Sequence, residues 1–73
     1  MKTVQESIQE AGTDKVNDIL DLLKAGKISK SESFRRLHRL GMTYYAISKV
    51  VSQALGTQVR VQFVHNVLGN VSK

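Results

Sequence analysis

Glycine placement constrains the fold of this chain more than any other feature of its sequence. Each glycine follows a segment in which apolar residues recur every three or four positions, as in an amphipathic helix. These glycines are Gly12, Gly26, Gly41, Gly56 and Gly69. A glycine just beyond such a segment supplies the left-handed residue that commonly ends a helix. The 73 residues include no proline to interrupt a helix from within. We therefore predict an all-α protein, a small helical bundle.

The N-terminal third contains two of the expected helices. Residues 3–11 form either a short helix or a frayed arm, because the segment is weakly apolar and close to the chain terminus. Thr13 or Asp14 is a suitable N-cap for the next helix, which extends to Ala25. Its apolar residues lie at helical spacing and are Val16, Ile19, Leu20 and Leu23.

Polar caps also define the two helices that follow. Ser29 and Glu32 have the spacing of a capping box and begin a helix that runs to Leu40. Thr43 caps a further helix over Tyr44–Leu55. On that helix Ala46, Ile47, Val50, Val51, Ala54 and Leu55 form one apolar face, and the polar residues on the other face include Tyr45, Ser48, Lys49 and Ser52.

The last segment, about Arg60–Leu68, is rich in β-branched valine, so a strand competes with a helix there. Its apolar residues recur every three positions rather than alternating, which favours a helix ended by Gly69. We expect Val61, Val64, Val67 and Leu68 to point inward.

Charge is distributed unevenly along the chain. Residues 1–23 carry two bases and five acids, a net charge of −3, whereas residues 24–73 carry nine bases and one acid, a net charge of +8. No acid follows Glu32. An acid-free basic surface is what binding of a polyanion requires, because each carboxylate near a phosphate would weaken the attraction.

Several functions are excluded or disfavoured by composition. The chain has no cysteine for a disulfide or a thiolate metal site, no glycine-rich phosphate loop and no apolar run of membrane-spanning length. Asp14, Asp18 and Asp21 lie along the solvent side of one helix rather than converging on a metal. We therefore expect no enzyme activity, no cofactor, no metal, no small-molecule substrate and no membrane partner.

Three short motifs lie along the C-terminal half: Ile47-Ser48-Lys49-Val50, Leu55-Gly56 and Val64-His65-Asn66-Val67-Leu68. In this order they resemble the prokaryotic helix-turn-helix, as found in short tri-helical DNA-binding domains of transcriptional regulators and in resolvase tails. Ser48 stands where that family prefers alanine. The segment between Val51 and Val59 is longer than in the compact motif, so either the first helix is extended or the turn is looser.

We expect one domain, 1–73, with three parts. These are an N-terminal arm or short helix over 1–12, an acidic supporting or dimerisation helix over 13–26, and a helix-turn-helix unit over 29–69. The resemblance covers only about residues 30–69, and it implies sequence-specific binding of double-stranded DNA by a small repressor or regulator of a plasmid, phage or other mobile element. A plasmid stability or partition factor, or the N-terminal part of a longer protein, would have the same pattern. We expect it in the cytoplasm, associated with the nucleoid.

Side-chain chemistry suggests which residues contact DNA. Arginine pairs with guanine, and glutamine or asparagine pairs with adenine, in the major groove. The expected base contacts, on the outer side of the last helix, are Arg60, Gln62, His65 and Asn66. The expected phosphate contacts lie in the turn, near helix starts and on the basic helix faces: Thr43, Tyr45, Lys49, Thr57, Gln58, Arg35, Arg36 and Arg39.

One such unit makes few base contacts, so we expect a homodimer on an inverted repeat, or several copies on direct repeats. Two alternatives remain open at this stage. A protein-interaction module, antitoxin-like or an adaptor, would use the same basic face to meet an acidic partner. An RNA-binding module would need exposed aromatic residues for unstacked bases, and most aromatic residues here are expected in the core.

Overall fold

The computed structural model describes residues 3–71, with side chains through Gly69, and contains five helices in that range. They are α1 (Val4–Ala11), α2 (Thr13–Lys24), α3 (Lys30–Arg39), α4 (Tyr44–Leu55) and α5 (Val61–Val71). No strand occurs between residues 3 and 71, so the predicted all-α class is confirmed. Met1 and Lys2 of the expected arm lie outside the described residues, as do the last two residues of the expected domain. None of the five helices has the length and apolar character needed to cross a membrane.

Local capping explains where most of the helices begin. The Thr43 hydroxyl accepts a hydrogen bond from the Ala46 N–H at 3.2 Å, and α4 has the predicted bounds. The Ser29 hydroxyl accepts likewise from the Glu32 N–H at 3.1 Å. The Glu32 carboxylate instead accepts from Arg35 and Arg36, so only half of the predicted capping box forms. Thr3 and Glu6 make a complete capping box at α1, so that segment is a helix rather than a frayed arm.

Two of the expected boundaries are wrong. Neither Thr13 nor Asp14 caps α2, because Gly12 takes the N-cap position with no side-chain hydrogen bond and Thr13 is already helical. Gly69 does not end the last helix, which continues to Val71. The other four glycines adopt positive φ between helices, whereas Gly69 does not, so it fits inside a helix.

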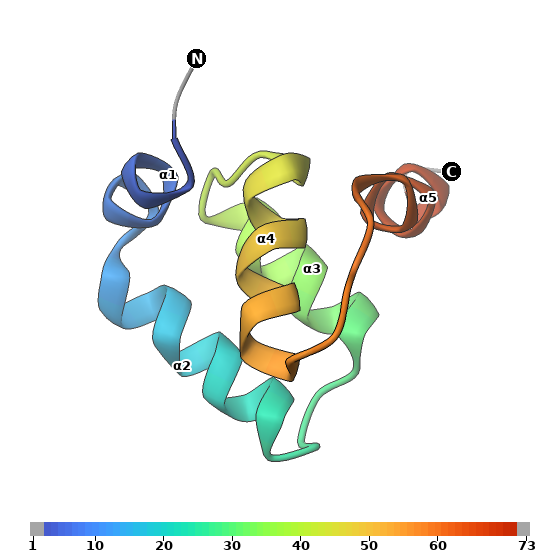
Figure 1. Cartoon of the computed structure of the whole chain (residues 1–73), viewed down its shortest axis with the longest axis horizontal. Helices are drawn as coiled ribbons and strands as arrows, with labels where there is room; N and C mark the ends of the chain where they lie inside the picture. Colours follow the sequence, from blue (N-terminus) through green and yellow to red (C-terminus); the bar gives the residue numbers. More distant parts are fainter. Residues whose placement is uncertain (1–2, 72–73) are drawn as a thin grey trace.

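Helix α4 is the centre of the bundle. It contacts each of the other four helices, with α1 and α2 on one side and α5 on the other (Figure 1). Helix α5 packs mainly on α3 and α4. The acidic residues before position 22 lie on α1 and α2, and α4 therefore separates them from α5.

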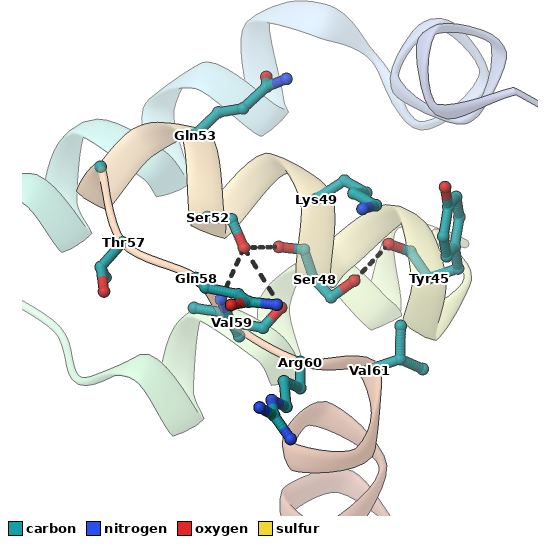
Figure 2. Close-up of a pocket in the computed structure, with 11 residues that line it drawn as sticks. Tyr45, Ser48, Lys49, Ser52, Gln53, Thr57, Gln58, Val59, Arg60 and Val61 are labelled. Atoms are coloured by element: carbon teal, nitrogen blue, oxygen red, sulfur yellow. Dashed lines mark hydrogen bonds between the residues drawn. The ribbon is translucent and has the colours of Figure 1, made fainter.

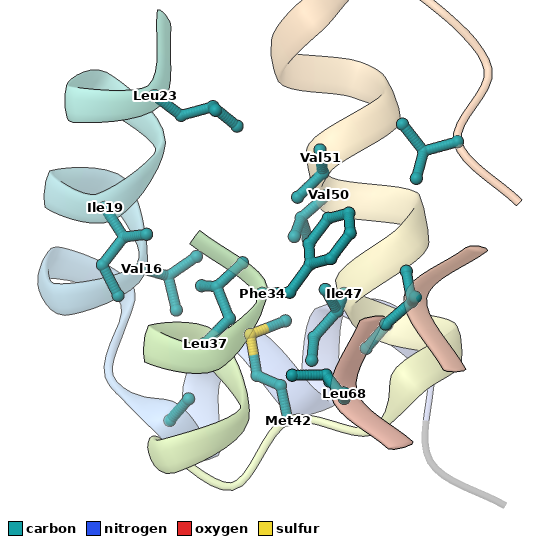
Figure 3. Packing of buried hydrophobic residues seen from close by; sticks show 14 residues of the cluster. Val16, Ile19, Leu23, Phe34, Leu37, Met42, Ile47, Val50, Val51 and Leu68 are labelled. Carbon is teal, nitrogen blue, oxygen red and sulfur yellow. The ribbon is translucent and has the colours of Figure 1, made fainter. Parts of the chain in front are cut away.

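The core is formed by the apolar faces that the sequence predicted, together with two residues from the connections. Phe34, Leu37 and Ile47 have no exposed surface and pack together at the centre (Figure 3). Met42 and Val59, from the segments flanking α4, are also buried. Side chains of this size each contribute roughly 1.5–3 kcal/mol when fully buried.

Three side chains lie differently from the expected positions. Ser48 is buried rather than on an outer face, because α4 is covered on nearly all sides, and its hydroxyl donates to the Tyr45 carbonyl at 2.7 Å. Val61 is 38% exposed rather than inward, because it is the first residue of α5 and lies beyond the core. Phe63, one of the aromatic residues for which we expected core packing, is 43% exposed, with its ring edge-on to that of Phe34 at 5.6 Å.

Candidate nucleic-acid interface

The connection between α4 and α5 determines how the candidate interface is built. It comprises residues 56–60 and begins with Gly56 in the left-handed conformation. Typical helix-turn-helix connections have three or four residues. The connection here, five residues between Leu55 and Val61, is longer than that.

Ser52 of α4 holds this connection on the bundle through hydrogen bonds. The Ser52 hydroxyl accepts from the Val59 N–H at 2.8 Å and lies within donating distance of two carbonyl oxygens, that of Ser48 at 2.6 Å and that of Val59 at 3.2 Å (Figure 2). The Val59 side chain is buried against the core. These contacts fix the backbone one residue before Arg60, and they set where α5 begins.

Five of the predicted DNA contacts surround one shallow hollow of about 540 Å³ between α4 and the connection. Tyr45 and Lys49 border it from α4, and the Lys49 ammonium lies 5.3 Å from the centroid of the Tyr45 ring. Thr57, Gln58 and Arg60 border it from the connection (Figure 2). Among the described residues, no acid lines this hollow.

The exposed face of α5 carries two of the predicted base contacts. The Gln62 side-chain amide donates to the Asn66 amide oxygen at 3.1 Å, as residues four apart on a helix do. Both side chains are exposed, and with Arg60 they border a second hollow of about 410 Å³. The bond uses the Gln62 amino group and the Asn66 oxygen, and it does not use the Gln62 oxygen or the Asn66 amino group.

The remaining predicted contacts lie apart from this group. His65 lies on the flank of α5, where its ring is edge-on to that of Tyr44 at 5.4 Å. Tyr44 also packs against the His38 ring at 5.3 Å. The Thr43 hydroxyl already accepts the capping bond of α4. Neither His65 nor Thr43 borders either of the two hollows.

The three arginines of α3 differ from one another. Arg36 donates to the Glu32 carboxylate at 2.9 Å and Arg35 contacts it at 3.4 Å, whereas Arg39 is exposed near the end of the helix. The hydrogen bond from Arg36, and then the charges of these arginines, lower the pKa of Glu32. Arg35 also has a buried Nε atom with no hydrogen-bond partner among the described residues. Arg35 and Arg36 therefore make contacts within α3, and Glu32 partly offsets their charges.

Sequence reasoning did not single out Lys30, although it borders the second hollow beside Arg60, Gln62 and Asn66. It lies thirty residues before Arg60, and no local pattern signals that the two are neighbours. Between residues 3 and 71 no group of three histidine, cysteine or acidic side chains is placed to hold a metal ion.

Neither a family model, nor a curated protein, nor a solved structure matches this chain.

Proposed function

We propose that this chain binds double-stranded DNA sequence-specifically through α4 and α5, as a small transcriptional repressor or regulator. The observation that carries the proposal is the exposed Gln62–Asn66 pair, which borders the second hollow together with Arg60. Arg60 borders the first hollow as well, and no acid of the described chain lines either one. The major groove admits an α-helix, and these three side-chain types form the common bidentate contacts to its bases.

Different roles follow for the side chains of the interface. Arg60, Gln62 and Asn66 meet base edges, while Tyr45, Lys49, Thr57 and Gln58 hold the phosphate backbone. Val61, exposed at the start of α5, adds an apolar group that suits the 5-methyl of thymine.

The charge distribution supports this orientation. The helices that carry most of the acids, α1 and α2, lie across α4 from α5 and would face away from the duplex. One module of this size makes few base contacts, so two or more copies act together on a repeated site.

Selection from randomised duplexes, followed by mobility shifts, tests the proposal. Arg60→Ala and Gln62→Ala should each reduce the preference for the selected site, by about 1–3 kcal/mol for every base that no longer has its bidentate partner. Arg39→Ala is the matched control, since Arg39 is exposed on α3 and borders neither hollow. It should weaken selected and random duplexes alike or leave both unchanged. Failure of the selection to enrich any sequence would reject the proposal.

The exposed Tyr45, Val61 and Phe63 favour a second candidate, a module that binds an acidic protein, since aromatic residues are enriched at protein interfaces. This candidate predicts no binding of duplex DNA even at low salt.

A further inference from the structure

Lys30 borders the second hollow, and it places a cation on the side of α5 away from Lys49. Helix α5 turns its buried residues, Val64 and Leu68, toward the bundle. At about 100° per residue, Val61 and Phe63 lie on opposite flanks of the exposed face. Val61 borders the first hollow and Phe63 the second, so the two hollows open on different sides of α5.

Each hollow has one lysine of its own. Lys49, from α4, borders the first, and Lys30, from the start of α3, borders the second; both lysines are exposed. Arg60 borders both hollows, and no carboxylate of residues 3–69 borders either. The exposed face of α5 is therefore flanked by a cation on each side.

The walls of the major groove are the two phosphate backbones, about 12 Å apart. A helix that lies in this groove has one strand on each flank. We propose that Lys30 and Lys49 bind phosphates of opposite strands, so that the duplex is held from both sides of α5. This inference rests on the proposed function, because it assigns the two flanks of the same interface.

Single-lysine variants test the inference, with Lys27→Ala as the matched control. Lys27 lies three residues before Lys30 and also borders a hollow, but that hollow is lined by Asp18 and Asp21. Lys30→Ala and Lys49→Ala should each make the slope of log affinity against log salt less steep, by about one. Between 50 and 200 mM salt, affinity should therefore fall about 3.5-fold less than for the unsubstituted protein. Lys27→Ala should leave the slope unchanged.

Duplexes with single neutral methylphosphonates identify the strand. Some methylphosphonates should weaken binding of the unsubstituted protein. In Lys30→Ala, those on one strand should no longer have this effect; in Lys49→Ala, those on the other strand should no longer have it. Effects of both variants on the same strand, or a Lys30→Ala variant that behaves as Lys27→Ala does, would overturn the inference while leaving DNA binding intact. If the unsubstituted protein binds no duplex, or binds single-stranded RNA more tightly, the proposed function itself fails.

Discussion

Ser52→Ala probes the hydrogen bond that sets the position of α5. In the folded protein the Val59 N–H donates to the Ser52 hydroxyl at 2.8 Å, and Val59 itself is 7% exposed. Removing the hydroxyl leaves this donor without its partner in a place that water reaches poorly. An unsatisfied buried donor costs about 1–3 kcal/mol.

This destabilisation is large enough to measure and small enough for the protein to remain folded. A chain of this length has a free energy of unfolding of roughly 4–11 kcal/mol. Each kcal/mol of destabilisation lowers the melting temperature of a domain this size by about 4–8 °C. Thermal and urea denaturation should therefore both detect the substitution.

Ser48→Ala is the matched control, one turn away on α4. Ser48 is also buried, but its hydroxyl only donates to the Tyr45 carbonyl, so its removal leaves no N–H group unpaired. We expect it to cost less than about 1 kcal/mol. Amide exchange at Val59 should accelerate in Ser52→Ala and not in Ser48→Ala. Equal stability of the two variants, with unchanged exchange at Val59, would refute the role given to Ser52.

Three further predictions concern helix ends, pH and base recognition. Gly56→Ala should destabilise the protein by about 1–2 kcal/mol because Gly56 has φ +68°, whereas Gly69→Ala should stabilise it by about 0.5–1 kcal/mol because an added Cβ inside α5 meets only ordinary contacts; denaturation midpoints that shift in the same direction would contradict this. The pKa of Glu32 is lowered in the folded state, chiefly by the hydrogen bond from Arg36, so its contribution to stability is present at neutral pH and disappears as pH falls through the folded-state pKa. Unfolding measured against pH should show a shallower decline in acid for Glu32→Gln, and identical profiles would remove this role. Replacing single thymines of a selected site by deoxyuridine should weaken binding at one position, and Val61→Ala should abolish that difference; a difference that persists in the variant would exclude contact with Val61.

Helix boundaries were predictable where the sequence carries a local signal. Thr43 with Gly56 predicted α4 to the residue, because a cap and a left-handed glycine act within one turn of the positions they determine. Gly69 gave a wrong boundary because a glycine can also continue a helix at modest cost.

Side-chain placement was less predictable, because periodicity gives the direction of a side chain but not what covers it. Val61 has the spacing of a core residue and yet lies beyond the core, whereas Ser48 is covered by neighbouring segments. Met42 and Val59 are buried from connecting segments that have no period.

Only the residues of the candidate interface that are close in sequence could be predicted. Tyr45, Lys49, Thr57 and Arg60 are close in sequence, so helix geometry and a short connection bring them together. Lys30 reaches the interface only because α3 packs on α5, a long-range contact that no sequence motif encodes.

Backbone amide NMR during titration with a selected duplex tests most directly whether α4 and α5 form the DNA-binding surface. We expect chemical shifts to change along residues 57–66 and at Lys30 and Lys49, while α1 and α2 remain nearly unaffected. Changes concentrated on α1 and α2, or none at an excess of duplex, would contradict this assignment of the surface.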